Sequence, residues 1–369
     1  MGIKNLGAVL RKHCPHVYED THISTFAGKR IGIDIIGYMY RYVAANPSRW
    51  LNSFVTLFCA LKRNQIRPLI VYEGTPPPEK ARTRERRNAT TQKIRDRAEE
   101  VDKLVEQITK YSEAVFQNQT DVTIENFDEV KSKCEVILKK LYKDELAVIS
   151  EPEDLLLYLD DLIKERDRLA KSCVYITRDH DQKLRRLVEI LGIPYVDAPG
   201  EAETLCAYLS KHNYITGVIT EDTDILAYGT ANFISKFTAR TERCVLLQYE
   251  KVLDGLEMDE QQFTDFCIMC GTDYNDNIPR CGAIGAYKKM IEYGDLDMLV
   301  EKSKMDTTIL NYKVSRRLFS VPKVFAFEMP RFVPPDFTEL EIFLAESDCS
   351  ITMAYIKKAW APVPLNFVD

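Results

Sequence analysis

The chain has 369 residues, of which 45% are hydrophobic, so it is long enough for one large domain or two ordinary ones. A formal net charge of −6 and a pI near 5.6 argue against a protein that coats nucleic acid over its whole surface. Its ten cysteines form no short-spaced framework, which indicates reduced thiols and an intracellular protein. The amino terminus lacks a signal-peptide core, and no run approaches the roughly 20 apolar residues of a membrane span.

Two buried strands, each ending on an acid, follow a short helix and a loop over residues 1–29. The first strand contains Asp34, and the second is followed directly by Glu73. An unpaired buried charge is costly, so an acid in such a strand favours a functional site over a structural role. The expected elements are strands at 30–36 and 68–72 and helices at 38–45 and 51–63. This pattern predicts α/β organisation with a site at the carboxyl edge of a parallel sheet.

A basic segment, residues 79–97, comes next. It has eight basic residues against three acids: Lys80, Arg82, Arg84, Arg86, Arg87, Lys93, Arg95 and Arg97 against Glu79, Glu85 and Asp96. A solvated helix face is one interpretation, and a phosphate-binding element after an acidic strand end is the favoured one. Residues 98–175 are charged with helical spacing, which indicates a helical insertion or arch without chemistry of its own.

The stretch from residue 197 to 224 holds two acidic pairs. Pro199 and Gly200 place Glu201 and Glu203 at the start of a helix predicted over 204–213. An apolar strand predicted over 214–220 then leads to Asp222 and Asp224. In extended backbone these two side chains point to the same side. Such an oxygen-only cluster is the setting that Mg²⁺ prefers.

The last third of the chain is predicted to contain a strand pair, 233–236 with 244–249, and an apolar helix at 260–270. Cys267 and Cys270 lie on that helix without a second pair at zinc-like spacing, so core packing is favoured over a metal site. A turn at 277–282 and a helix at 283–293 complete a helix-turn-helix module whose turn amides can face a phosphate. Residues 296–369 are expected to hold two further helices and a final loop.

These features together resemble the flap endonucleases of the XPG-type structure-specific 5′ nuclease family. The matching stretches run in order from the amino terminus: Met1-Gly2-Ile3 with Leu6, Ile33-Asp34, residues 71–74 with Pro76, Pro77 and Lys80, residues 192–203, residues 220–224, residues 271–274 and residues 277–279. Their order and spacing cover residues 1 to about 295.

The resemblance implies a PIN-like nuclease fold, with a mostly parallel central sheet, a helical arch and a helix-turn-helix DNA-binding module. The nuclease core would span 1–295, divided into 1–80, the arch and insertion at 81–180, and 181–295. A C-terminal helical extension would cover 296–369.

The resemblance also implies two Mg²⁺ ions, which Mn²⁺ can replace, held by a cluster of acids. Carried over position by position, the ligands are Asp34, Glu73, Glu201, Glu203, Asp222, Asp224 and Asp273. Lys80 matches the catalytic lysine of the arch, and a second basic arch residue is one of Arg84, Arg86 and Arg87. The implied DNA-binding residues are Gly2, Tyr40, which stacks on a base, and Asn277, Ile278, Cys281 and Gly282, which grip duplex phosphates with a K⁺ ion.

Four features depart from the family pattern. Glu73 stands where aspartate is usual, and Arg280 stands where the turn commonly has its first glycine. The stretch between Lys80 and Gly192 is longer than in a typical flap endonuclease. No sliding-clamp peptide of the Gln-x-x-Leu-x-x-Phe-Phe kind is recognisable near the C-terminus.

The expected function is a structure-specific DNA endonuclease that cleaves 5′ flaps or branched DNA in replication, repair or recombination. The alternatives are a Holliday-junction resolvase or 5′–3′ exonuclease of the same family, and an inactive scaffold that binds DNA junctions. All seven acidic positions are retained, which favours catalysis. We expect a monomer that binds DNA and no membrane, in the nucleus or at another site of DNA replication.

Overall fold

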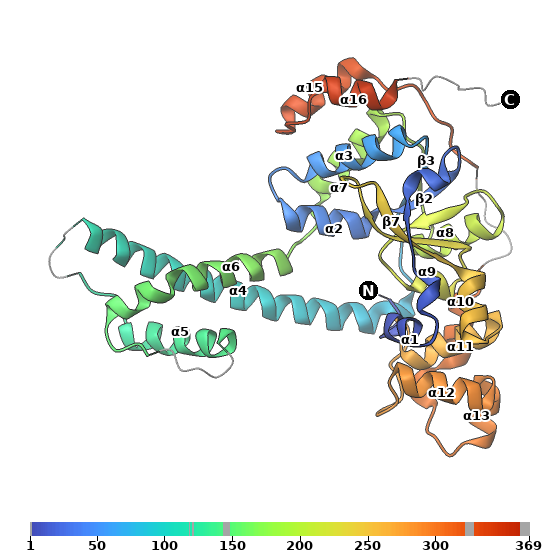
Figure 1. The fold of residues 1–369 in the computed structure, drawn as a ribbon. Coiled ribbons are helices and arrows are strands. Elements are labelled where there is room, and N and C mark those ends of the chain that lie inside the picture. The colour runs from blue at the N-terminus through green and yellow to red at the C-terminus, as the bar shows by residue number, and fades with distance from the viewer. Residues whose placement is uncertain (1, 118, 120–121, 143–147, 322–327, 362–369) are drawn as a thin grey trace. The chain divides into compact units, whose positions relative to one another are not determined.

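The computed structural model describes residues 2–117, 119, 122–142, 148–321 and 328–361. The chain separates into two compact units, each described here by itself. Residues 1–83 and 176–369 form the larger unit, and residues 84–175 form the smaller one. All strands of the described chain belong to the larger unit (Figure 1). The finer division of that unit at residue 295 stays a prediction.

A seven-stranded, mostly parallel sheet lies at the centre of the larger unit, in the order β1-β7-β6-β5-β2-β3-β4. Its strands are β1 (Glu19–His22), β2 (Arg30–Asp34), β3 (Arg67–Tyr72), β4 (Tyr195–Asp197), β5 (Gly217–Ile219), β6 (Asn232–Thr238) and β7 (Arg243–Gln248). Five adjacent strands of the sheet are parallel to one another: β4, β3, β2, β5 and β6. The strand β7 runs antiparallel to both of its neighbours, β6 and β1. Asp34 lies opposite Val71, and Ile33 lies opposite Ile219, so three strands end at one edge. The predicted α/β organisation is confirmed.

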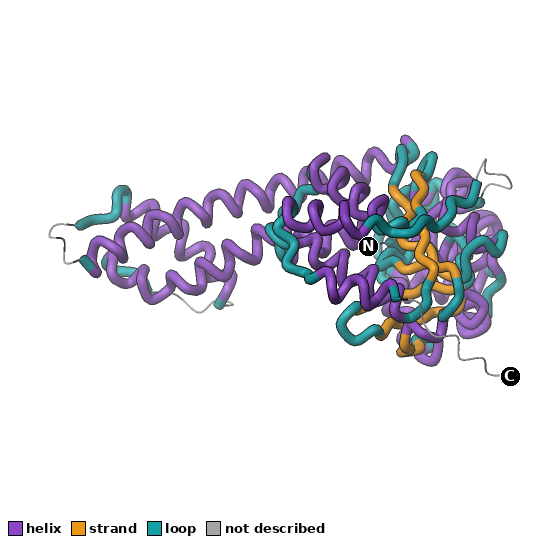
Figure 2. The backbone as a smooth tube through the Cα atoms, turned by 90° about the horizontal axis from the view of Figure 1, so that it is seen from above, coloured by secondary structure: helices purple, strands orange, loops and turns teal. Residues whose placement is uncertain are grey.

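Helices cover both faces of this sheet (Figures 1 and 2). α2 (Ile35–Ala45) and α3 (Trp50–Arg63) contact β3, while α8 (Ala202–Lys211) contacts β2, β3 and β5. Alternate residues of a strand face opposite sides, and Leu69 and Val71 of β3 accordingly pack in one core with Val218 and the α8 residue Cys206. Strands buried on both faces explain the continuous apolar runs in the sequence.

The amino-terminal segment differs from its prediction as one helix and a loop. α1 (Leu6–His13) is followed by the strand β1, which pairs with β7 at the edge of the sheet. The β1 sequence, Glu-Asp-Thr-His, is entirely polar and remains partly exposed. Edge strands do not need an apolar face, so hydrophobic periodicity gave no signal for this one.

The helix-turn-helix module is confirmed as α11 (Glu260–Cys270), a turn and α12 (Ala283–Tyr293). Neighbouring helices are α9 (Asp224–Ala227), α10 (Tyr249–Leu256), α13 (Leu296–Lys302) and α14 (Tyr312–Phe319). Cys267 and Cys270 are buried free thiols in this core, as predicted.

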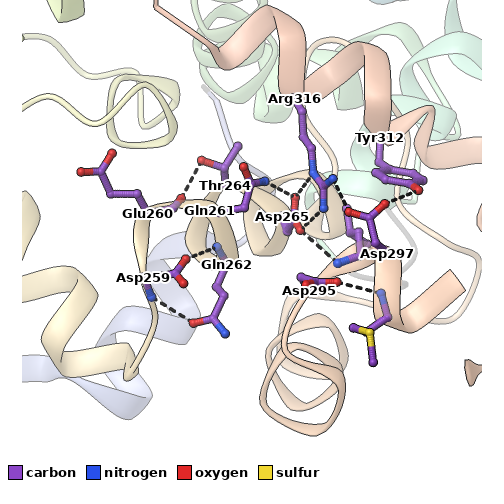
Figure 3. A network of polar contacts seen from close by, with 12 residues as sticks. Asp259, Glu260, Gln261, Gln262, Thr264, Asp265, Asp295, Asp297, Tyr312 and Arg316 are labelled. Carbon is purple, nitrogen blue, oxygen red and sulfur yellow. Dashed lines mark hydrogen bonds and ion pairs between the residues drawn. The ribbon is translucent and has the colours of Figure 1, made fainter. Parts of the chain in front are cut away.

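A buried ion pair connects α11 of this module to its neighbours α13 and α14 (Figure 3). Asp265 of α11 is fully buried and accepts hydrogen bonds from Arg316 Nε at 2.7 Å and Nη2 at 2.5 Å. It also accepts one from the backbone N–H of Leu296 at 3.0 Å. Arg316 of α14 reaches Asp297 of α13 at 2.5 Å. Bidentate pairs of this kind fix geometry as well as charge.

The C-terminal segment contains more helices than predicted. Instead of two, the described residues after 295 hold α13, α14, α15 (Phe337–Glu346) and α16 (Met353–Trp360). α15 packs on α7 (Arg178–Ile190), and α16 packs on α3. The predicted final loop, residues 362–369, lies outside the described residues. None of the helices in the described part of the chain is long and apolar enough to span a bilayer.

The smaller unit is helical and has a core of its own (Figure 2). Its helices are α5 (Phe127–Leu141), α6 (Leu159–Ser172) and most of α4 (Ala81–Phe116). The core includes Val101 and Ile108 of α4, Leu138 of α5 and Leu162 of α6. The predicted helical character of residues 98–175 is therefore confirmed.

Candidate metal-dependent nuclease site

The predicted acids gather at the carboxyl edge of the sheet. Asp34 ends β2 and precedes α2, and Glu73 follows the last residue of β3. Asp222 comes shortly after β5, which lies beside β2 in the sheet. Glu201 is the extended residue that precedes α8, and Glu203 lies in the first turn of that helix, as predicted. Strands that are distant in sequence therefore bring their terminal acids to one edge.

The local conformation of Asp222 and Asp224 differs from the extended backbone that we expected. Thr223 has a helical conformation, with φ −76° and ψ −9°, and α9 begins at Asp224. The backbone N–H of Asp224 donates to Asp222 Oδ1 at 3.0 Å. Aspartate forms such local turns readily because its short side chain reaches a backbone N–H two residues on. The two acids thus remain close through a turn, not through strand alternation.

Burial raises the proton affinity of these acids. Asp34, Glu203 and Asp224 are 4%, 8% and 5% exposed. Burial raises the pKa of Asp34 to about 6, and it raises the pKa of Glu73 to about 7. Burial also raises the pKa values of Glu203 and Asp224, and the neighbouring carboxylates Asp34 and Asp222 add repulsion. These raised values mean that the negative charge of the cluster is incompletely balanced by the protein.

Lys80 is the cation that the protein places among these acids. Its ammonium forms an ion pair with Glu201 and lies 3.4 Å from Asp273 Oδ2. Burial alone would lower the pKa of Lys80, but attraction by Glu201 and Glu203 raises it above the ordinary value. Lys80 therefore remains charged at the edge of the site. It precedes α4 directly, where the basic segment begins.

Among the residues that the structure describes, three buried carboxylate oxygens have no hydrogen-bond partner: Asp34 Oδ1, Glu203 Oε2 and Asp224 Oδ1. Buried acceptors are normally paired, and such orphans indicate a missing cation or water. An oxygen-only donor set fits Mg²⁺ or Mn²⁺, which accept carboxylates together with waters. Within the described residues, no three acidic, histidine or cysteine side chains already form a closed ligand set. The donors thus fit a hard cation that keeps part of its water shell.

Two tyrosines next to the cluster were missed at the level of sequence. The Tyr274 hydroxyl donates to Glu201 Oε2, and the Tyr228 hydroxyl lies 2.6 Å from that of Tyr274. Tyr228 also donates to Glu201 at 3.4 Å. Two sequence positions could have indicated these tyrosines. Tyr274 directly follows the predicted ligand Asp273, and Tyr228 lies four residues, about one helical turn, after the predicted ligand Asp224.

Gly2 lies against the Asp222–Asp224 turn. Its φ of +92° is strained for any other residue, and a Cβ atom there would stand 2.2 Å from Asp222 Oδ1 and 2.8 Å from the backbone nitrogen of Asp224. Lys4 anchors the same segment through its ion pair with Asp276 at 2.9 Å. The glycine is therefore required for close approach of the amino-terminal backbone to the acids.

The predicted duplex-binding turn has an ordered geometry. The Asn277 amide donates to the carbonyl oxygens of Ile278 at 3.2 Å and Cys281 at 3.1 Å. Arg280 has φ +63°, the left-handed conformation that glycine adopts most easily. This conformation explains why glycine is expected at the position, and Arg280 adopts it at a cost in backbone strain. Gly282 precedes α12.

The remaining predicted residues lie on helices. Tyr40 of α2 is 45% exposed, so its ring is accessible from solvent. Arg84, Arg86 and Arg87 lie in α4, within the smaller unit, whose position relative to the acids is not defined. Of the predicted residues, the acids and Lys80 are therefore the ones that the structure brings together in one site.

Comparison with known proteins identifies the family. The XPG N-terminal domain matches residues 1–94, and the XPG I-region matches residues 192–273. A probable RAD2-like endonuclease of Invertebrate iridescent virus 3 is 32% identical over 343 residues, covering 88% of this chain and 86% of that protein. Flap endonuclease 1 of Debaryomyces hansenii is 27% identical over 380 residues, covering 97% and 84%.

A solved structure of the catalytic core of Rad2 in complex with DNA substrate has the same fold, with a TM-score of 0.62 and 16% identity over 98% of this chain and 99% of that one. The chain therefore belongs to the XPG family of structure-specific nucleases, as a member that resembles the flap endonucleases. These enzymes hydrolyse phosphodiester bonds and depend on divalent metal ions.

Proposed function

We propose that this chain is a structure-specific endonuclease that cuts 5′ flaps or branched DNA and leaves a 5′-phosphate. The observation that carries the proposal is the buried carboxylate cluster, with its unpaired oxygens and a charged lysine beside it. The relatives named flap endonuclease 1 and RAD2-like endonuclease support it.

Two Mg²⁺ ions are proposed as cofactors, with Mn²⁺ as a substitute. Their ligands, direct or through water, would be Asp34, Glu73, Glu201, Glu203, Asp222, Asp224 and Asp273. Bound there, such ions would activate a water and stabilise the leaving oxygen of the phosphodiester.

Lys80 would contribute positive charge next to the scissile phosphate. Its pairing with Glu201 and Asp273 fixes the ammonium without neutralising the whole cluster. A preorganised charge of this kind stabilises the transition state, because it needs no rearrangement during reaction. The Tyr274 hydroxyl holds the other oxygen of Glu201, so it would keep that carboxylate oriented while Lys80 acts.

The substrate would be held at several further places. The exposed ring of Tyr40 would stack on a base, and one of Arg84, Arg86 and Arg87 would contact the displaced strand. The turn around Asn277 would hold duplex phosphates. A K⁺ ion is proposed there because the flap endonucleases that this turn resembles hold a monovalent cation at the corresponding turn.

Replication, repair or recombination of DNA is the proposed setting, in the nucleus or at another site of DNA synthesis. A monomer is the proposed form. The relatives named flap endonuclease 1 support flap cleavage, the activity on which this proposed setting rests.

A cleavage panel tests the proposal. The protein is given flapped, nicked, four-way-junction and single-stranded DNA in Mg²⁺, in parallel with Asp224→Ala. We expect cutting near the flap base and loss of cutting by the variant, which should still bind duplex DNA. Preferred cutting of the four-way junction would favour a resolvase, and preferred degradation from ends would favour an exonuclease. Binding without any cutting would make the chain a scaffold.

A further inference from the structure

A pocket of about 620 Å³ lies on the larger unit, and none of its lining belongs to the acid cluster. Its walls come from the start of β2, the start of β3, the end of α3 and residues 329–335 before α15. Four of its lining residues are cations: Arg30, Lys62, Arg67 and Arg331. No aspartate or glutamate among the described residues lines it.

No acidic residue in the described part of the chain balances the positive charge of this pocket. Among the described residues, none of the four cations forms an ion pair; Arg30 donates to the backbone oxygen of Tyr214 at 3.2 Å. The nearest acids in sequence to residues 329–335 are exposed Glu328 and Asp336, and Asp336 caps α15 by accepting from the N–H groups of Thr338 and Glu339. A pocket with cations and no anion favours an anionic occupant.

The contacts and the pKa of Lys62 reflect the unbalanced positive charge of the pocket. Its ammonium lies over the ring of Phe332 at 4.9 Å and over that of Trp360 at 5.7 Å. Burial lowers the pKa of Lys62, and the nearby Arg67 lowers it further. Aromatic faces replace a carboxylate as the partner of this cation, which leaves its charge available to a ligand.

The pocket lies at the amino ends of β2 and β3, whereas the nuclease site lies at the carboxyl ends of these strands. Arg30 begins β2 and Asp34 ends it, so the two ends are about 13 Å apart along that strand. A ligand in the pocket would therefore leave the carboxyl edge open to DNA.

The lining distinguishes between kinds of anion. A DNA duplex is too wide to enter the pocket, and Lys62 already lies over one face each of Phe332 and Trp360, which leaves less ring surface for a base to stack on. The apolar walls include Met329, Val333 and four prolines. Such walls suit a ligand that carries apolar side chains between its charges.

We propose that this pocket binds an acidic peptide segment of a partner protein, in which carboxylates flank apolar side chains. The carboxylates would pair with Arg30, Arg67 and Arg331, and an apolar side chain would pack against Met329 and Phe332. Arginine forms bidentate pairs with carboxylates, which makes such a contact selective.

The test uses the full chain without metal, so that it does not depend on nuclease activity. The probe is a fluorescein-labelled synthetic peptide in which acidic residues flank two phenylalanines. Its matched control has glutamine and asparagine in place of the acids. Binding is measured by fluorescence anisotropy at two salt concentrations. The chain has two tryptophans, and in a Trp50→Phe background Trp360 alone reports occupancy of the pocket.

We expect the acidic peptide to bind, to change Trp360 emission and to lose affinity with salt, while the amide control does not bind. Arg67→Glu with Arg331→Glu should weaken binding at least tenfold, and Lys62→Gln should weaken it less. Both arginines are exposed, so the fold should persist. Lys304→Glu, an exposed cation outside the pocket, should change nothing. Flap cutting by the double variant should equal that of the parent.

Four results would overturn the proposal. One is the absence of peptide binding by the parent, and another is unchanged binding by the double variant. The third is tighter binding of oligothymidylate than of the peptide, with loss in the same variant, which would make the pocket a phosphate site. Self-association that the double variant abolishes would instead make a second copy of the chain the occupant.

Discussion

Seven carboxylates near one sheet edge repel one another, and burial increases that repulsion. The ammonium of Lys80 balances part of the charge, and the hydroxyl groups of Thr220 and Tyr274 each donate to one acid. Asp224 Oδ1 and Glu203 Oε2 have no such partner in the described part of the chain. At the scale of single residues, the site therefore gives up stability, which we attribute to the cation binding that we propose for it.

Asp224→Asn should make the metal-free protein more stable. The change keeps the shape of the side chain and removes one buried, poorly compensated charge. In EDTA we expect a higher melting temperature than that of the parent, by about 2–4 °C for each kcal/mol gained. Addition of Mg²⁺ should raise the melting temperature of the parent more than that of the variant.

Exposed Asp160→Asn serves as the control and should leave melting unchanged in both buffers. Equal melting of parent and Asp224→Asn in EDTA would mean that Asp224 carries no repulsive energy, contrary to its buried position.

Lys80→Ala should reduce turnover with little loss of affinity. The ammonium acts on charge that develops in the transition state, so its removal should lower kcat on a flap substrate by about 10²–10³-fold. Single-turnover cutting in Mg²⁺ gives the rate, and equilibrium binding in Ca²⁺ gives the affinity. A variant with normal kcat and weak binding would assign Lys80 to substrate holding.

At the scale of elements, hydrophobic periodicity predicted the helices and buried strands that pack in a core, such as β3 and α11, within a few residues. It failed for β1, where pairing with β7 stabilises four polar residues. It also failed at Asp222 to Asp224, because a side-chain hydrogen bond to the backbone ends the extended segment. In both places polar contacts decide the conformation.

Glu165 of α6 is the element-scale contact that we expect to depend on pH. It is 3% exposed and accepts from Arg168 at 2.6 Å and from Arg97 of α4 at 3.1 Å. The hydrogen bond from Arg168 holds the pKa of Glu165 below its ordinary value, although burial opposes this. A lowered pKa in the folded state means that the stabilisation is present above the unfolded pKa, roughly 4.3, and is lost as pH falls through the folded value.

Glu165→Gln should therefore destabilise the smaller unit at pH 7 by about 1–2 kcal/mol and have little effect at strongly acidic pH. Hydrogen exchange of the α4 and α6 amides, read by mass spectrometry, measures this unit inside the full chain. The control is Glu106→Gln, in an exposed pair with Lys110. A deficit that persists unchanged at low pH would show that packing, not charge, is responsible.

At the scale of the whole molecule, the two compact units divide the proposed work. The larger one holds the acids, Lys80, the turn at Asn277 and the pocket at the opposite sheet edge. The smaller one carries Arg84, Arg86 and Arg87 on a helix that starts directly after Lys80. Along the chain, the smaller unit begins at Arg84, four residues after Lys80.

Replacement of Arg84, Arg86 and Arg87 by alanine should weaken binding of flapped DNA more than binding of plain duplex. Phosphate contacts release counterions, so the slope of log affinity against log salt should also become shallower for the flapped substrate. Lys103, Lys110 and Lys131, replaced together, remove the same number of charges elsewhere in the unit and serve as the control. If the arginine variant binds and cuts flaps like the parent, this helix is a solvated face.

The sequence alone was enough to identify the acids at the strand ends, the helix start at Glu201, Lys80 and the family. These features depend on neighbouring residues and short spacings. Only the tertiary structure decided which distant groups meet. Thr220 donates to Asp34 across 186 positions, and Tyr274 reaches Glu201 across 73. The cationic pocket likewise joins Arg30 and Lys62 to Arg331 and Trp360. Strand order and helix packing set such contacts, and both result from the free energy of the whole core, which no local pattern encodes.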